Sequence, residues 1–261
     1  MRATTIASCL LVAAGVLTLT GSASAAEIKV FISGGFSAAY DTLLPEFERT
    51  TGHKIVTERG PSMGETPQAI PNRLARGESA DLVIMVGYAL DNLIKKDLVV
   101  TDGRADLAWS PIAMAVKAGA PKPDISTVDA FRRALLAAKS IAYSDSASGE
   151  YLSKTLFKQI GVYNQIKDKA RKIPAEPVAK VVARGEAEIG FQAVSELRPF
   201  KGADIVGPIP NELQIVNTFA AGIAKSAKQP EAAKALIAFL VSPAAKPAIE
   251  ESGMLFVDQK K

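Results

Sequence analysis

Two loops that combine serine with glycine carry the residue types best suited to holding an anion. Ser33-Gly34-Gly35 follows an apolar segment at residues 28–32, and a second loop at residues 144–149 follows another at residues 140–143. A helical pattern comes next in both places, and backbone N–H groups at a helix start attract negative charge. A tight strand–helix turn also explains the glycines. We expect two anion-binding helix N-termini that face one cleft.

A third loop, at residues 59–64, ends the second predicted strand, at the edge where open α/β sheets place ligand loops. Its Arg59 has the planar fork that binds a carboxylate bidentately, and an ordinary surface arginine is the alternative. The other predicted ligand contacts from these loops and strand ends are Ser62, Met63, Gly64, Ser146, Ser148, Gly149 and Gln192.

Glu150 directly follows the second serine loop, in the predicted first turn of its helix. The helix dipole favours a carboxylate there, so simple capping explains it as well as a role in the cleft does. Capping explains two of the loop serines equally well. Tyr143 and Glu65, at a strand end and in a loop, are further candidates for the cleft.

A repeated phrase shows which elements position these loops. Ala-Arg-Gly-Glu occurs at residues 75–78 and again at residues 183–186, each time shortly before an apolar run. Each copy is typical of a helix end, a glycine with positive φ after it, a tight turn and a buried strand. The repeat indicates two similar α/β lobes.

The expected architecture is α/β, with mainly parallel sheets in two lobes joined by two hinge crossings. Lobe 1 comprises residues 26–112 and 216–261, and lobe 2 comprises residues 113–215. Residues 109–116 and 213–223 are the predicted crossings. A strongly amphipathic helix at residues 230–241 is expected to pack on lobe 1. Hinge closure around a ligand is a common use of this layout.

Residues 1–25 have the pattern of a cleaved export signal. Arg2 precedes an apolar run at residues 6–19, and Ala23-Ser24-Ala25 fits a cleavage site. We therefore expect a periplasmic protein without a membrane anchor. Cys9 is the only cysteine, so the mature chain would have no disulfide, thiol nucleophile or cysteine-bound metal.

Several functions are excluded by composition and motif. The net charge is only +4, and no basic run with interleaved aromatic residues occurs, which argues against nucleic acid. No phosphate-binding P-loop, dinucleotide fingerprint or H-E-x-x-H motif is present. The single histidine, His53, is expected in a solvent-facing turn. We predict no metal and no cofactor.

From Ile28 onward the chain resembles the periplasmic molybdate-binding proteins, which have the type 2 solute-binding fold. The likeness is carried by residues 30–31, 75–77, 80–81, 147–151, 173–176 and 189–190. Within that family it looks similar to the branch of periplasmic aconitate isomerases. This second likeness lies in residues 33–37, 60–64, 144–149 and 190–196.

The resemblance implies that Ser62, Ser148 and Val178 contact the ligand. Two positions depart from the molybdate pattern, because Gly35 replaces a serine and Ala193 replaces a tyrosine. The loss of one hydroxyl from each lobe argues against a small tetrahedral oxyanion, and Arg59 suits a larger carboxylate.

The resemblance therefore implies interconversion of trans- and cis-aconitate by an allylic proton shift without a cofactor. Serine hydroxyls, loop amides and Arg59 would hold a tricarboxylate, and Glu150, Glu65 or Tyr143 would move the proton. A closed cleft of low polarity would raise the pKa of the carboxylate that acts as base.

Two alternatives fit the same fold. A binding protein would deliver an oxyanion or organic acid to an ABC permease, and a sensor subunit would use a similar binding-only cleft. A proton-transfer residue within reach of ligand carbon distinguishes the enzyme from both. The chain is expected to act as a monomer.

Overall fold

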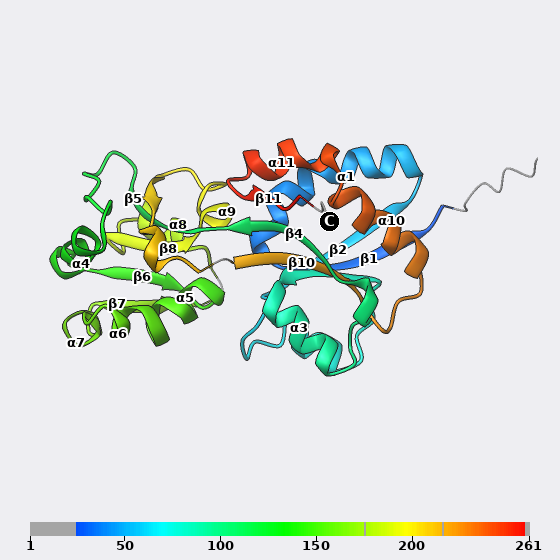
Figure 1. Ribbon diagram of the computed structural model, residues 1–261, viewed down its shortest axis with the longest axis horizontal. Helices are drawn as coiled ribbons and strands as arrows, with labels where there is room; N and C mark the ends of the chain where they lie inside the picture. Colours follow the sequence, from blue (N-terminus) through cyan, green and yellow to red (C-terminus); the bar gives the residue numbers. More distant parts are fainter. Residues whose placement is uncertain (1–24, 175, 216, 259–261) are drawn as a thin grey trace, which may run out of the picture.

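The computed structural model describes residues 25–174, 176–215 and 217–258, so nearly all of the predicted export signal lies outside it. Two α/β bodies lie end to end along the long axis of the molecule (Figure 1). Each is built around one sheet, and strand β4 of the first sheet leads directly into β5 of the second. The α/β fold with two sheets agrees with the sequence analysis.

The larger sheet has six strands in the order β11-β4-β10-β3-β1-β2. Strands β2, β1 and β3 are parallel, and β10, β4 and β11 join them antiparallel. The strand bounds are β1 Glu27–Ile32, β2 Lys54–Arg59, β3 Leu82–Val86, β4 Ala105–Ser110, β10 Asn217–Ile223 and β11 Leu255–Phe256.

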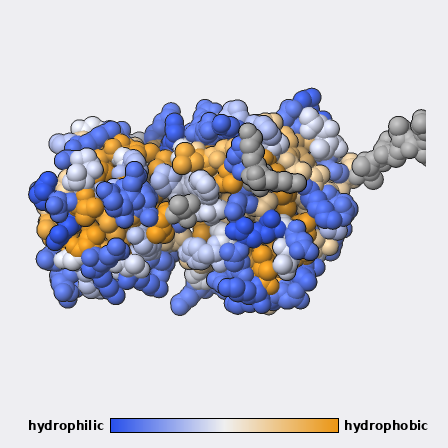
Figure 2. Space-filling view, in the orientation of Figure 1, coloured by the Kyte–Doolittle hydropathy of each residue, from blue (hydrophilic) through white to orange (hydrophobic). Residues whose placement is uncertain are grey.

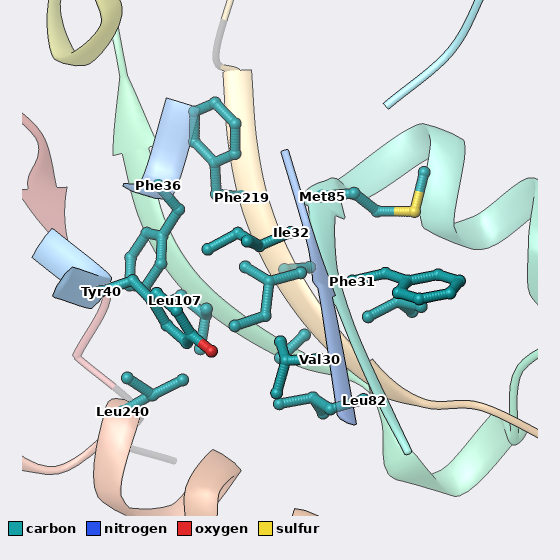
Figure 3. Packing of buried hydrophobic residues seen from close by; sticks show 14 of the residues in the cluster. Val30, Phe31, Ile32, Phe36, Tyr40, Leu82, Met85, Leu107, Phe219 and Leu240 are labelled. Atoms are coloured by element: carbon teal, nitrogen blue, oxygen red, sulfur yellow. The ribbon is translucent and has the colours of Figure 1, made fainter. Parts of the chain in front are cut away.

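Helices cover both faces of this sheet. Helices α1, α10 and α11 lie on one face, and α3 lies on the other (Figure 1). Their bounds, with α2, are α1 Ser37–Thr51, α2 Ile70–Ala75, α3 Gly87–Lys95, α10 Pro230–Leu240 and α11 Lys246–Glu251. Leu240 and Tyr40 pack against the same side of the sheet as Val30 (Figure 3). The predicted packing of the C-terminal helix is therefore confirmed.

The smaller sheet has five strands in the order β7-β6-β8-β5-β9. Strands β7, β6 and β8 are parallel, and β5 and β9 are antiparallel to their neighbours. Each sheet thus has the expected parallel part, extended by antiparallel strands. The strand bounds are β5 Ile112–Lys117, β6 Ile141–Ser144, β7 Ala170–Ile173, β8 Ile189–Ala193 and β9 Ala203–Pro208.

The helix after β6 is continuous but not regular. It begins as α5 (Ala147–Tyr151), passes through a π-helical segment (Leu152–Leu156) and ends as α6 (Phe157–Gln159). The other helices of this body are α4 Val128–Ala137, α7 Tyr163–Ile166, α8 Val178–Ala183 and α9 Val194–Leu197. Short 3₁₀ turns occur at Gly34–Phe36, Thr101–Gly103, Asn211–Leu213 and Pro243–Ala245.

The repeated phrase folds as predicted. Gly77 and Gly185 follow α2 and α8 with φ of +84° and +76°, and each donates its N–H to a carbonyl of the last helical turn. A left-handed residue at this point favours glycine and ends the helix before a buried strand. The repeat was enough to predict these helix ends, because a glycine that ends a helix depends only on residues next to it in the sequence.

The first crossing differs in detail from its prediction. Residues 109–116 do not form one strand, because Pro111 separates β4 from β5. Proline has no N–H for a sheet ladder, so the chain leaves one sheet there and enters the other. The return crossing ends in β10, which pairs with β3 and β4 of the larger sheet.

His53 corrects another expectation, because it is buried rather than facing solvent. Its Nδ1 accepts the Ala26 N–H at 3.0 Å, and its ring lies 6.0 Å from that of Phe47. Among the described residues, no single helix is long and apolar enough to cross a membrane. The bent pair α10 and α11 passes that test jointly, although both helices bury side chains in the core.

Candidate functional site

A chamber of about 210 Å³ lies between the two bodies and is lined from both. This volume is below the range of drug-sized ligand pockets and suits a small molecule. On the face that Figure 2 shows, hydrophilic residues surround hydrophobic patches on both bodies. The residues lining the chamber include Ser33, Gly34, Gly35, Ser62, Asp145, Ser146, Ser148, Glu176, Gln192, Ala193, Glu196, Asn217 and Phe219.

The first wall comes from the strand ends of the larger sheet. Ser33 follows β1, and its buried Oγ has no hydrogen-bond partner within the described chain. Ser62 is also buried, and its Oγ accepts the Val86 N–H at 3.0 Å, which leaves its own hydroxyl proton for a ligand. Both serines were predicted, and the structure places both at the chamber.

Gly35 is explained by the residue packed against it. A Cβ at Gly35 would lie 2.0 Å from Cζ of Phe219, so the aromatic ring occupies the space of a side chain. Phe219 extends from β10 beside Phe36 (Figure 3). The hydroxyl that the molybdate pattern has at this position is thus replaced by an apolar surface on the chamber wall.

The second wall is a network of serine hydroxyls. Ser144 Oγ lies 2.8 Å from Ser146 Oγ and 3.1 Å from Ser148 Oγ. Ser146 precedes α5, but its side chain makes no capping hydrogen bond. Capping therefore does not explain this serine. Ser146 and Ser148 line the chamber, and Ser144 joins their hydroxyls without lining it. Gly149 permits this arrangement, because a Cβ there would lie 1.7 Å from the Ser144 carbonyl oxygen.

Gln192 lines the chamber, but Val178 does not. The Val178 N–H donates to Gln192 Oε1 at 2.9 Å, and the Val178 side chain is buried among other apolar residues. The resemblance implied that Val178 contacts the ligand, but its N–H is already hydrogen-bonded to the Gln192 side chain. Because this hydrogen bond occupies Oε1, the amide N–H₂ of Gln192 is the group left to donate hydrogen bonds to other residues, among them Glu196.

Two chamber residues were missed by the sequence analysis. Asn217, at the start of β10, has a buried Oδ1 without a hydrogen-bond partner in the described chain. Glu196, on α9, is half-buried and keeps its carboxylate at the chamber. Glu196 is the last residue of segment 190–196, one of the segments that resemble the aconitate isomerases. That likeness is the signal by which the sequence could have indicated Glu196.

The environment of Glu196 shifts its pKa strongly. Burial, with a smaller contribution from the nearby Asp145, raises the pKa of this carboxyl to about 7. Hydrogen bonds from the Gln192 side chain and the Ala193 N–H lower the pKa in part. Its Oε1 would be 3.3 Å from a Cβ at Gly34, so Glu196 faces the opposite wall.

Glu150 lies instead in an outer vestibule of about 970 Å³, which shares Gly60, Pro61 and Asp145 with the chamber. Its carboxylate pairs with Lys154 and with Lys172, the latter at 2.6 Å. These lysines lower the pKa of Glu150, Lys154 most, which is opposite to the raised pKa that the sequence analysis expected of the base.

Arg59 is directed to α1 rather than to the chamber. Its Nη2 lies 2.7 and 2.9 Å from the two carboxylate oxygens of Asp41, and its Nη1 donates to Ser37 Oγ at 2.6 Å. The predicted carboxylate clamp is thus occupied by a carboxylate of the chain itself. Arg59 still borders the vestibule.

The remaining predicted residues lie outside the chamber. Glu65, Met63 and Gly64 line the vestibule, and Tyr88 donates its hydroxyl proton to the Met63 sulfur at 3.3 Å. Tyr143 packs edge-on against Phe157, with 6.2 Å between ring centroids, and lines neither cavity. No cluster of three or more potential metal ligands occurs within residues 25–174, 176–215 and 217–258.

A small chamber between two α/β lobes, lined by strand-end loops of both, is the binding site of a solute-binding protein. The chain belongs to the bacterial extracellular solute-binding protein family, whose sequence profile matches residues 28–255. It is 52% identical over 227 residues to an aconitate isomerase from Pseudomonas sp., and the match covers 87% of each chain.

Two molybdate binders are more distant. The molybdate-binding protein ModA of Azotobacter vinelandii is 26% identical over 255 residues, covering 94% of this chain and 96% of that protein. A solved structure of a periplasmic molybdate-binding protein from the same organism superposes with a TM-score of 0.71 at 19% identity. It covers 88% of this chain and 99% of that one, and it shows the shared fold.

Proposed function

We propose that the chain is a periplasmic aconitate isomerase, which interconverts trans- and cis-aconitate without a cofactor. The observation that carries this proposal is the 52% identity to an aconitate isomerase over most of both chains. The chamber agrees with it, because it combines hydroxyl donors from both lobes with a carboxylate whose pKa is near neutrality. We further propose that the protein acts as a monomer on a soluble tricarboxylate.

The reaction moves one proton between the terminal carbons of an allyl system. When the proton leaves the CH₂ carbon, negative charge spreads over three carbons and onto the attached carboxylates. Preorganised donors stabilise such charge where it develops. Ser33 and Ser148 are the hydroxyl donors that the two walls bring to the chamber, and both are buried.

The charges of the two cavities suggest how a trianion lies between them. The chamber is lined by Asp145, Glu176 and Glu196, and its described lining contains no lysine or arginine. The vestibule has cations as well as acids in its lining, namely Arg59, Lys154 and Lys172 beside Glu65, Asp145 and Glu150. We infer that the reacting allyl group enters the chamber, while a carboxylate that does not react remains near the vestibule lysines.

Replacing Lys172 by methionine is therefore expected to raise KM for trans-aconitate roughly 10- to 100-fold, with a much smaller change in kcat. A charge-assisted hydrogen bond contributes about 1.5–3 kcal/mol, which corresponds to that range. Steady-state kinetics would measure the effect. Lys158→Met, on the outer face of α6 beside Tyr163, is the matched control. A lower kcat with an unchanged KM would place Lys172 in the chemical step instead.

The proposed function is tested by incubating the purified protein with trans-aconitate in deuterated buffer. We expect cis-aconitate to accumulate in proton NMR spectra, with deuterium in the CH₂ groups wherever the shifted proton exchanges with solvent. The saturated tricarboxylate, which has no double bond to move, should remain unchanged. Trans-aconitate that stays unchanged at high protein concentration would exclude the isomerase.

A binding protein for an oxyanion or organic acid, serving an ABC permease, is the second candidate. The observation that favours it is the chamber's set of neutral hydroxyl donors, together with the molybdate-binding relatives. Calorimetric titration with molybdate separates the two functions. The isomerase predicts weak or absent molybdate binding, because Gly35 and Ala193 contribute no hydroxyl.

A further inference from the structure

We propose that Glu196 is the catalytic residue that removes the proton from one terminal carbon of the substrate and returns it to the other. This inference rests on the proposed function and deepens it by naming the proton-transfer group. It differs from the sequence analysis, which considered Glu150, Glu65 and Tyr143.

The position of Glu196 is the first support. It lies at the start of α9, directly after β8, and its carboxylate lines the chamber. Gly34 of the other wall lies close to it, because an added Cβ there would come within 3.3 Å of Glu196 Oε1. The carboxylate therefore lies where the two walls meet, and a small ligand in the chamber would be within its reach, which is the first requirement of a general base.

Glu176, another acid at the chamber, has different surroundings. Glu176 pairs with Arg184 through bonds of 2.9 and 3.0 Å, and this arginine lowers the pKa of the Glu176 carboxyl. Glu150, one cavity further out, is held by two lysines. A carboxylate stabilised by cations is a weak base. Glu196 has neutral hydrogen-bonding partners instead, the Gln192 amide and the Ala193 N–H.

Proton affinity is the second support. Burial raises the pKa of Glu196 to about 7, so both its acid and base forms are populated near neutral pH. A group that must accept and then return a proton works best with a pKa close to the working pH. The groups that bear on this pKa are Gln192 and Ala193 of β8 and, as the charged one, Asp145 after β6.

The transfer balances without any co-reactant. A Glu196 carboxylate oxygen takes the proton as the C–H bond of the CH₂ group breaks, and the electron pair delocalises over the allyl system and its carboxylates. The Glu196 carboxyl then donates the proton to the opposite terminal carbon, forming the new C–H bond there. The double bond has moved, Glu196 is a carboxylate again, and nothing has been oxidised or reduced.

Gln192 is the positioning residue for this carboxylate. Its Oε1 accepts the Val178 N–H at 2.9 Å, which orients its amide N–H₂ toward Glu196. Because this hydrogen bond lowers the pKa of Glu196, its loss should raise that pKa. Gln192→Met is therefore expected to move the pH profile of kcat/KM to higher pH, which a purely structural role would not do.

The test compares wild type, Glu196→Gln and Glu196→Asp with trans-aconitate. We expect Glu196→Gln to lower kcat about 10²- to 10⁴-fold, the usual contribution of a general base, and Glu196→Asp to lower it less. Calorimetric titration should show that Glu196→Gln still binds trans-aconitate, which excludes misfolding. Wild-type kcat/KM should rise with pH through about 7, since only the deprotonated carboxylate accepts a proton.

Control variants make the outcomes distinct. Glu231→Gln, on the exposed face of α10, should behave as wild type. An inactive wild type would defeat the proposed function itself. An active wild type together with an active Glu196→Gln variant and an unaltered pH profile would overturn the role of Glu196 alone.

Discussion

Gly149→Ala is expected to lower kcat/KM at least 100-fold and to destabilise the protein by about 2–4 kcal/mol, more than overpacking usually costs because the obstacle is backbone. The added Cβ would lie 1.7 Å from the Ser144 carbonyl oxygen and 2.7 Å from its carbon. Neither atom can move without shifting β6 or α5. The Ser144, Ser146 and Ser148 hydroxyls would then lose their arrangement.

Thermal unfolding and steady-state kinetics measure the two effects separately. Thr155→Ala is the matched control, because Thr155 is exposed on the same continuous helix. It should change neither stability nor activity appreciably. Wild-type kinetics in Gly149→Ala would mean that the close approach of α5 to β6 is not needed for the hydroxyl network.

Gly35→Ser has the second large expected effect, because it introduces a side chain into the space of Phe219. The new Cβ would lie 2.0 Å from Phe219 Cζ and 2.3 Å from its Cε1. An aromatic ring can rotate or withdraw, so we expect a cost of about 1–3 kcal/mol. Because the displaced ring would enter the chamber, kcat/KM should fall at least tenfold.

A double-mutant cycle with Phe219→Ala isolates this interaction. Phe219→Ala alone should destabilise the protein by about 3–5 kcal/mol, through the cavity that it leaves in the core. Gly35→Ser added to that variant should cost at least 1 kcal/mol less than in the wild-type background, since the obstacle is gone. Additive free energies of unfolding would show that the two residues do not compete for space.

Much of the fold was predictable because its signals are local. The glycines after α2 and α8 need a positive φ that neighbouring residues alone impose, and both were identified by the repeat. The strands after them were recognisable as short apolar runs. The division of the first crossing at Pro111 was less evident, because only the strand pairing shows that β4 and β5 belong to different sheets.

The loops that form the candidate site could be predicted, but the partners of its charged side chains could not. Ser33, Ser62 and the serines after β6 follow from strand-end positions, and the structure places them at the chamber. Arg59 was misjudged because its partner, Asp41, lies on a helix face that becomes its neighbour only when α1 packs beside β2. Sequence spacing gives no information on such a choice of partner.

Glu196 was missed for the same reason that Arg59 was misjudged, because the residues around it become its neighbours only in the folded protein. Its surroundings come from β8, from the turn at Gly34 and from the loop that contains Asp145, which are far apart along the chain. A carboxylate's pKa depends on how these segments exclude water around it. Glu150 had a suggestive position beside the serine loop, but folding brings Lys172 of β7 against it.

Strand β10 has a consequence for the order in which the molecule can assemble. It lies in the interior of the larger sheet, between β3 and β4, yet it is formed by Asn217–Ile223, near the end of the chain. As the polypeptide emerges from a ribosome or a translocation channel, the smaller sheet is complete once β9 has appeared. The larger sheet cannot be completed at that stage, because β3 and β4 have already emerged but β10, which pairs between them, has not. One lobe can thus fold early, while the other stays incomplete until β10 has also emerged.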